Sequence, residues 1–200
     1  MTVKLSHRQR QASATREAIA KTALQLFADR GYVATTIQAI SEAADIPAPT
    51  IYSALGSKPA ILEEIRRLWI AEASVEELYA HALTKREPVE RLRLAAKWTR
   101  RQMELGHDVI TVYQEAARAD PRARAQWADA LAGREAAVRT LLTSMAECLR
   151  PRLDVKQAMD LYVVATLPEV FRSLVLERDW SPDEYEAWLA ERLEAELLGG

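Results

Sequence analysis

The sequence predicts an all-α protein of about nine helices. Only six of the 200 residues are glycine, whereas alanine, leucine, glutamate and arginine, which favour helices, are abundant. Apolar residues recur at helical spacing along most of the chain. Asp120-Pro121 and Ser181-Pro182 place a capping residue directly before proline, the preferred order at a helix start. We expect no strands.

The first helix is predicted by apolar spacing near the N-terminus. It should cover about 12–30, because the apolar residues between Ile19 and Phe27 share one helical face and Gly31 can end the helix. The basic stretch 1–11 precedes it and has no apolar periodicity. We therefore expect that stretch to be a flexible arm.

Two shorter helices follow, joined by a tight turn. Thr35 or Thr36 caps the first of them, and Asp45 lies at the turn, where aspartate is well tolerated. The next helix begins near Pro47 and continues to about Leu55, because proline in a first turn removes no intrahelical hydrogen bond. The pattern predicts a helix-turn-helix.

Apolar spacing and the positions of Gly and Pro predict six more helices in the remainder of the chain. Gly106 should separate two of them, and Pro151 should end another. The predicted segments are 57–80, 88–105, 108–119, 121–149, one that starts at 154 and bends at Pro168, and one from 182 to the glycines at 199 and 200.

The composition is typical of a soluble globular protein, with 49% apolar and 28% charged residues. No apolar run approaches the roughly 20 residues that cross a bilayer, and the basic N-terminus lacks the apolar core of a secretory signal. Cys148 is the only cysteine, which excludes an intrachain disulfide and fits a reducing compartment. We expect a cytoplasmic protein without membrane association, and we interpret Cys148 as buried and inert.

The net charge of −2 conceals two regions of opposite sign. Residues 1–60 hold seven Lys and Arg against four Asp and Glu, whereas the rest holds 20 against 25. A basic N-terminal region on an acidic body is expected when only one end of a protein meets a polyanion.

The helix-turn-helix, about residues 36–55, and this charge division together indicate DNA binding. Short side chains on its second helix let the backbone approach base edges, and Ala, Pro and Thr suit contact with thymine methyl groups. The predicted contacts are Pro47, Ala48, Pro49, Thr50 and Ser53 in the groove, Thr36, Tyr52 and Lys58 on phosphates, and Arg8, Arg10 and Arg16 on phosphates or in the minor groove.

The run Phe27…Gly31…Thr35-Thr36-Ile37…Ile40…Ala43-Ala44-Asp45-Ile46-Pro47…Pro49-Thr50-Ile51-Tyr52…Leu55…Ser57-Lys58 resembles the DNA-binding domain of the TetR family of transcriptional regulators. The resemblance covers about residues 13–65. It implies a homodimer with a DNA-binding domain at 12–56 and an effector-binding and dimerisation domain at 57–200, in which 57–80 is the connecting helix. The chain departs from the family pattern at Asp45, Pro49, Leu55 and Pro59, where Gly, Gly, Phe and Glu are usual.

The C-terminal body offers residues for an effector and for a second protomer. Aromatic and Met side chains suit a mostly apolar ligand, although each can equally be ordinary core. The candidate effector residues are Trp98, Met103, Tyr113, Trp127, Met145, Tyr162 and Phe171. The candidate dimer residues are Val163, Val170, Leu174, Tyr185, Trp188 and Leu189, which alternatively cover the protomer's own core.

No catalytic or metal-binding set is recognisable, because the three histidines are scattered and no glycine-rich phosphate loop is present. We expect no cofactor, no metal and no enzyme activity. The sequence favours a ligand-responsive transcriptional regulator, most simply a repressor released from a palindromic double-stranded operator. The alternatives are an all-α enzyme or small-molecule carrier with a purely structural N-terminal bundle, and a helical adaptor that binds only protein. The effector, the operator and the choice between repressor and activator stay open.

Overall fold

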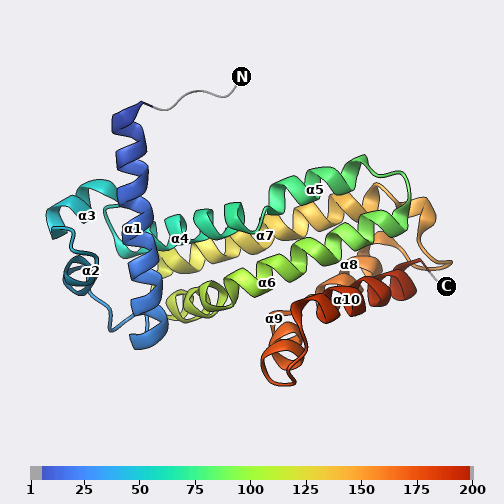
Figure 1. The fold of residues 1–200 in the computed structure, drawn as a ribbon. Coiled ribbons are helices and arrows are strands. Elements are labelled where there is room, and N and C mark those ends of the chain that lie inside the picture. The colour runs from blue at the N-terminus through green and yellow to red at the C-terminus, as the bar shows by residue number, and fades with distance from the viewer. Residues whose placement is uncertain (1–5, 199–200) are drawn as a thin grey trace. The chain divides into compact units, whose positions relative to one another are not determined.

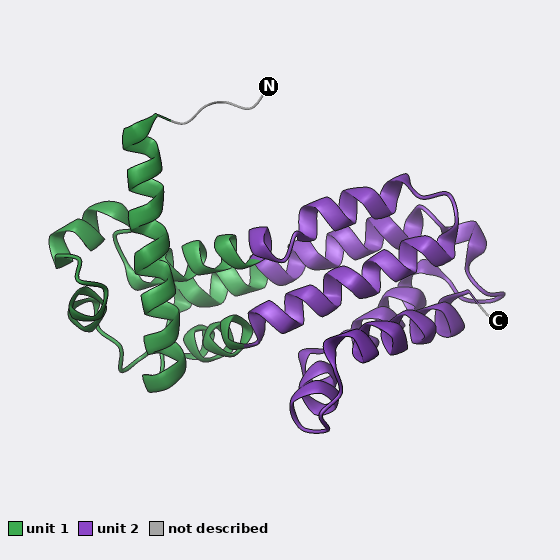
Figure 2. Ribbon diagram, in the orientation of Figure 1, with its two compact units in different colours: residues 1–69, 108–129 green, residues 70–107, 130–200 purple. Residues whose placement is uncertain are grey.

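The computed structural model describes residues 6–198, and it confirms the predicted all-α class. The chain forms two compact units (Figure 2). Unit 1 contains the residues up to Trp69 together with Asp108–Asp129, and unit 2 contains Ile70–His107 together with the residues from Ala130 onward. Unit 1 thus includes a segment that the sequence assigns to the second domain.

Unit 1 holds the helix-turn-helix region, formed by α1 (His7–Arg30), α2 (Ile37–Ala44) and α3 (Ala48–Ala54) (Figure 1). The first part of α4 (Lys58–Glu72) completes this group. Its apolar core consists of side chains that are at most 1% exposed, among them Ile19, Ala23, Phe27, Ile40, Ile51, Ile61 and Leu62. Burial of these faces fixes the angles between the short helices, which could not be stable alone.

Helix α1 begins at His7, earlier than apolar spacing predicts. Ser6 and Gln9 form a capping box, in which the Ser6 side chain accepts from the Gln9 N–H at 3.3 Å and the Gln9 side chain accepts from the Ser6 N–H at 2.8 Å. Residues 7–11, which we expected in the flexible arm, are therefore helical. Residues 1–5 of that arm lie outside the described residues.

The single connecting helix predicted at 57–80 is in fact two helices. Ser74 has a φ of 54° and separates α4 from α5 (Val75–Thr84). The Arg101 guanidinium donates to the carbonyl oxygens of the last two residues before Ser74, at 2.9 and 3.0 Å. The break follows from this distant arginine, and no glycine or proline marks it.

Helix α6 (Pro88–Ala119) is continuous, so the predicted break at Gly106 is wrong. A helical glycine costs only about 1 kcal/mol relative to alanine. Met103, Val109 and Ile110 are each at most 5% exposed, and their burial outweighs that cost.

Helix α7 (Pro121–Thr143) ends earlier than predicted and is followed by a 3-10 turn at Ala146–Cys148. The Arg91 guanidinium donates to the backbone carbonyl and side chain of Ser144 at 2.9 and 2.7 Å, which satisfies the end of α7. Cys148 is exposed, so its interpretation as a buried residue is wrong.

Unit 2 is completed by α8 (Val155–Ala165), α9 (Pro168–Phe171), a π-helical turn at Arg172–Leu176, and α10 (Pro182–Leu197). Pro168 starts a new helix instead of bending a longer one. The fully or nearly fully buried core includes Leu92, Ala95, Leu141, Leu142, Met159, Tyr162, Leu189 and Leu193. Among the described helices, none is long and apolar enough to cross a membrane.

Candidate DNA-binding surface

The groove residues predicted around Thr50 lie on the outer side of α3. Thr50 and Ser53 are exposed, and Tyr52 is 55% exposed. Ile51, between them, is fully buried in the unit 1 core. Burial of Ile51 therefore orients the hydroxyl-bearing side chains of α3 toward solvent.

The start of α3 is shaped by two prolines. Pro47 and Pro49 are exposed and Ala48 is half-buried, and neither proline has a backbone N–H. The N–H groups of Thr50 and Ile51 donate to the Pro47 carbonyl at 2.8 and 3.2 Å. The first turn thus presents side chains and few backbone donors to the outside.

The turn between α2 and α3 is held by hydrogen bonds. The Ser41 hydroxyl donates to the Ile46 carbonyl at 2.7 Å, and the Ile46 N–H donates to the Ser41 carbonyl at 3.2 Å. Asp45 has a φ of 52°, a left-handed conformation that aspartate tolerates.

At the other end of α2, the exposed Thr36 hydroxyl oxygen accepts a hydrogen bond from the Ala39 N–H at 3.0 Å. The hydroxyl hydrogen of Thr36 is therefore available for a phosphate.

Lys58 does not extend into solvent as a phosphate contact would. Its ammonium donates to the Tyr32 carbonyl and, at 2.8 Å, to the Thr35 carbonyl, and lies 4.3 Å from the centre of the Tyr32 ring. Partial burial lowers the pKa of this ammonium. Lys58 therefore stabilises the loop between α1 and α2 in this structure, and the phosphate contact predicted for it stays a prediction.

The three arginines predicted to add contacts from the arm all lie in α1, and one of them, Arg16, forms an ion pair within unit 1 although its side chain is 46% exposed. Arg16 donates to Glu64 on α4 at 3.0 Å, and Glu64, 3% exposed, also binds Arg67 at 2.7 Å. Hydrogen bonds from Arg67 and Arg16 lower the pKa of the Glu64 carboxyl despite its burial. Arg16 thus has a structural partner in unit 1, and its predicted DNA contact stays a prediction, as do those of Arg8 and Arg10, which are exposed near the start of α1.

Sequence reasoning missed a polar cluster that joins the loop after α1 to the 108–129 segment of unit 1. The Tyr32 N–H donates to the Glu115 carboxylate at 2.9 Å, and the Tyr32 hydroxyl donates to Asp120 at 3.2 Å. Burial and then Asp120 raise the pKa of the Tyr32 hydroxyl. Gly31, with a φ of 85°, lets Glu115 approach, because a Cβ there would lie 2.9 Å from the carboxylate oxygen. The participants are more than 80 residues apart, so no local pattern could reveal them.

The candidate effector residues occupy core positions in both units. Tyr113 stacks on half-buried Trp127 in unit 1, with ring centroids 5.3 Å apart. In unit 2, the Tyr162 hydroxyl lies 3.3 Å from the Thr99 hydroxyl, and the buried hydroxyl of Tyr185 has no hydrogen-bond partner among the described residues. The other members, each at most 5% exposed, are Trp98, Met103, Met145 and Phe171.

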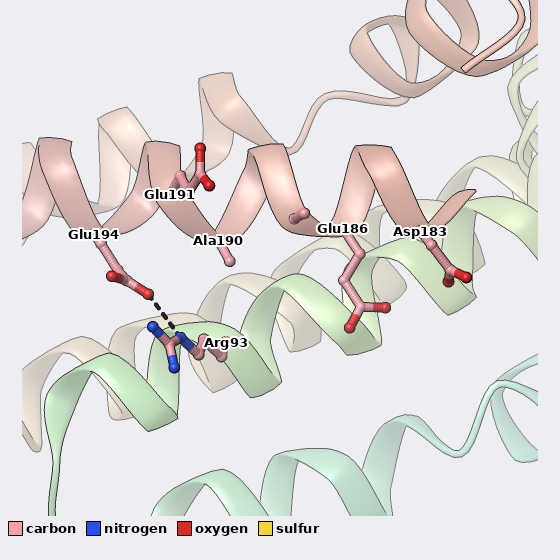
Figure 3. A pocket seen from close by; sticks show the side chains of 7 residues that line it. Arg93, Asp183, Glu186, Ala190, Glu191 and Glu194 are labelled. Carbon is pink, nitrogen blue, oxygen red and sulfur yellow. Dashed lines mark hydrogen bonds and ion pairs between the residues drawn. The ribbon is translucent and has the colours of Figure 1, made fainter. Parts of the chain in front are cut away.

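A surface groove of about 420 Å³ lies between α6 and α10, and none of these aromatic residues lines it (Figure 3). Its lining is mainly acidic: Arg93, Asp183, Glu186, Ala187, Ala190, Glu191 and Glu194. Arg93 donates to Glu194 at 3.1 Å (Figure 3), and Arg100 binds Asp183 and Glu186 at 2.9 and 3.0 Å. These ion pairs join the two helices and occupy most of the acidic groups. Among the described residues no group of His, Cys, Asp or Glu could hold a metal ion.

The predicted dimer residues divide into exposed and buried sets. Val163 is 36% exposed, and Val170, Leu174 and Trp188 are half-buried. Tyr185 and Leu189 have no exposed surface, so they belong to the protomer's own core and cannot meet a partner. Further apolar side chains are exposed beside Val163 in the sequence, at Val164 (62%) and Leu167 (39%), and in the π-helical turn at Leu176 (52%).

Comparison with known proteins agrees with this geometry. Residues 19–65 match the family described as "Bacterial regulatory proteins, tetR family". This match contains α2, α3 and the turn between them. A search of curated proteins finds no match.

Solved structures share the fold over nearly the whole chain. The fatty acid degradation regulator FadR from Bacillus halodurans has a TM-score of 0.73 at 20% identity, and the match covers 93% of this chain and 95% of that one. The TetR family regulator PfmR from Thermus thermophilus has a TM-score of 0.67 at 23% identity, with 98% of both chains covered. The ketosteroid transcriptional regulator KstR2 from Mycobacterium tuberculosis has a TM-score of 0.66 at 22% identity, with 98% of this chain and 97% of that one covered. Residues 19–65 are therefore similar to the tetR family of bacterial regulatory proteins, and the chain shares the fold of these solved regulators.

Proposed function

We propose that this chain is a cytoplasmic transcriptional regulator that represses by binding a double-stranded operator and is released by a small effector. The observation that carries the proposal is the exposed side of α3 around Thr50, which a buried Ile51 and a hydrogen-bonded turn hold in place. A short helix with small outer residues, fixed at its inner face, can enter a major groove. The proposed groove contacts are Pro47, Ala48, Pro49, Thr50 and Ser53, flanked by phosphate contacts from Thr36, Tyr52, Arg8 and Arg10.

The proposed functional form is a homodimer on a palindromic site. Val163, Val164 and Leu167 expose an apolar face on α8 and just beyond it, and α10 contributes half-buried Trp188. Pairing of such faces about a twofold axis buries apolar area on both protomers. The two copies of α3 would then contact half-sites separated by about one helical turn, roughly 34 Å.

The effector is proposed to be small and mostly apolar. The aromatic and Met residues of the effector set favour such a ligand. FadR and KstR2 are named for fatty acid degradation and for ketosteroids, which are apolar compound classes. A coupling of about 1–3 kcal/mol between effector and operator, or roughly 5- to 150-fold in affinity, is enough for a switch.

The DNA-binding proposal is tested by electrophoretic mobility shift with genomic fragments, followed by mutation of α3. We expect Thr50→Ala to change which fragments bind, and Tyr52→Phe to weaken binding to all of them. Thr140→Ala and Tyr79→Phe make the same chemical changes in unit 2 and should leave DNA affinity unchanged. Equal affinity of all four variants and the wild type would refute the assigned surface, whereas no shift of any fragment by the wild type would favour the carrier.

The effector proposal is tested by titrating the protein–operator complex with saturated fatty acids of different length and with ketosteroids. We expect one class to release the operator at concentrations that leave the thermal stability of the protein intact or raise it. Release by none of these compounds, with release by polar metabolites, would contradict an apolar effector.

A further inference from the structure

We infer that α3 recognises its operator through the 5-methyl groups of thymine and not through hydrogen bonds to guanine or adenine. The inference rests on the proposed DNA-binding function and assigns the bases that the same surface selects. Three properties of α3 and its surroundings support it: the types of side chain, the backbone donors and the exposed apolar atoms.

The residues around α3 lack the side chains that usually distinguish bases. Bidentate recognition of guanine requires Arg or Lys, and that of adenine requires Asn or Gln. Residues 31–57, all of them described, contain no Lys or Arg and carry the acids Glu42 and Asp45. Gln38 is the only amide side chain in this stretch, lies on α2 and donates to Glu42 at 2.9 Å. Neither purine can therefore be selected by a bidentate contact from α3.

The backbone of α3 cannot replace these side chains. Pro47 and Pro49 have no N–H, and the N–H groups of Thr50 and Ile51 donate to the Pro47 carbonyl. Proline also fixes φ at positions 47 and 49, which reduces the backbone freedom of the first turn. The remaining backbone donor in this turn is that of Ala48.

The groups that remain are apolar atoms and hydroxyls. Hydroxyls of Thr50 and Ser53 can donate or accept, so they bond to several base edges without strict selection. The Pro49 ring and the Thr50 methyl group are on exposed residues, with the Ala48 methyl group beside them. In the major groove the thymine 5-methyl is the one apolar substituent on a base edge, and small side chains allow the close approach that such contact needs.

The deciding experiment removes only the methyl group. An operator is first obtained by selection of random duplexes with the full-length protein, and each thymine in both half-sites is then replaced in turn by deoxyuridine. Burying a methyl-sized group contributes about 0.8 kcal/mol, which is roughly four-fold in affinity for each methyl removed. We expect such a loss at one or more thymines in each half-site, and no loss at thymines outside the half-sites.

Two further substitutions separate the methyl group from other features of the base pair. Replacement of a critical T·A pair by C·G should weaken binding, and 5-methylcytosine at the same position should restore part of the affinity, because it carries the methyl group at the same ring position. On the protein, Thr50→Val keeps the methyl group and loses the hydroxyl, whereas Thr50→Ser does the reverse. We expect Thr50→Val to retain sensitivity to deoxyuridine at the critical thymine and Thr50→Ser to lose it.

The outcomes distinguish this inference from the proposed function. If the selected operator binds specifically but no deoxyuridine replacement weakens it, methyl recognition is refuted and DNA binding stands. Selection of half-sites in which guanine is required at every fixed position would also overturn the inference. If the wild-type protein selects no duplex, the DNA-binding proposal itself fails, and with it this inference.

Discussion

The Glu115 carboxylate accepts a hydrogen bond from the Tyr32 N–H at 2.9 Å, and this bond joins α6 to the loop that follows α1. Both residues belong to unit 1, together with the helix-turn-helix. Tyr32 is 3% exposed and packs on Phe27 with ring centroids 5.1 Å apart. The helix-turn-helix region is thus stabilised by a part of the chain that lies well beyond it in sequence.

The Tyr32–Glu115 bond should be important for stability. Glu115→Ala leaves the buried Tyr32 N–H without its acceptor, and we expect a loss of about 1–3 kcal/mol in the free energy of unfolding. Urea denaturation measures this loss. Glu135→Ala removes an exposed ion pair with Arg139 and should change stability by less than about 0.5 kcal/mol. If Glu115→Ala and Glu135→Ala changed the free energy of unfolding equally, the stabilising role of the Tyr32–Glu115 hydrogen bond would be refuted.

Gly31 should not tolerate a side chain. Gly31→Ala places a Cβ at a φ of 85° and 2.9 Å from Glu115 Oε1, so we expect destabilisation by more than about 1 kcal/mol. Gly133→Ala is the matched control, because Gly133 is helical and no atom lies within 4 Å of its added Cβ. That change should stabilise by roughly 0.5–1 kcal/mol. Thermal unfolding of both variants distinguishes them, and a neutral Gly31→Ala would refute the close approach.

Glu64 should make stability depend on acid pH. Its folded pKa is lowered, chiefly by hydrogen bonds from Arg67, so its contribution is present above the unfolded pKa and is lost as pH falls through the lower folded pKa. Glu64→Gln should therefore be less stable than the wild type at pH 7, by about 2 kcal/mol. The difference should shrink below about pH 4.5, as urea titrations at several pH values would show. Glu63→Gln, a change at the exposed neighbour that takes no part in the ion pair between Glu64 and Arg67, should cost less stability at pH 7 than Glu64→Gln. A constant difference between Glu64→Gln and the wild type at all pH values would contradict the ion pairs.

Arg8 and Arg16 should differ in their effect on DNA binding. Arg8→Ala removes one proposed phosphate contact from each protomer, so the slope of log affinity against log salt should fall by about 2 for a dimer. Arg16→Ala loses its bond to Glu64 and should lower stability while leaving that slope unchanged. Binding titrations at several salt concentrations measure both. A smaller salt slope for Arg16→Ala, with no change for Arg8→Ala, would support the predicted DNA contact of Arg16 and contradict that of Arg8.

The exposed apolar face around Val164 should support dimer formation. Val164→Glu places a charge on a residue that is 62% exposed and should shift the protein toward monomer. Leu131→Glu makes a comparable change on α7, at a leucine that is 45% exposed, and should leave the association unchanged. Sedimentation equilibrium provides the measurement. A dimer unaffected by Val164→Glu would place the interface elsewhere.

The sequence predicted those parts of the fold that depend on local signals. Thr36 caps α2, Asp154 caps α8 and Ser181 caps α10, and each is recognisable from residue type and spacing alone. The exposed side of α3 follows from the same periodicity that buries Ile51. Its role in DNA binding is supported by the family match and remains a prediction for each residue.

Sequence-based prediction failed where a side chain that is distant in sequence determines the local structure. Arg101 accounts for the break at Ser74, which has no proline or glycine. Likewise, the sequence did not reveal the intramolecular partners of Lys58 and Arg16, which are the Thr35 carbonyl and the buried Glu64 carboxylate, because only tertiary structure brings them together. Charge pattern shows that a region is basic, whereas the contacts determine which cations can meet a phosphate.

The two carboxylate oxygens of Asp120 accept hydrogen bonds from two different parts of unit 1. One accepts the Tyr32 hydroxyl at 3.2 Å, and the other accepts the Arg122 N–H at 2.8 Å at the start of α7. Fraying of the first turn of α7 and detachment of the Tyr32 ring are therefore coupled through one side chain. Amide hydrogens at these two places should exchange with solvent through a shared opening event, so this junction behaves as one cooperative element despite its origin in remote stretches of the polypeptide.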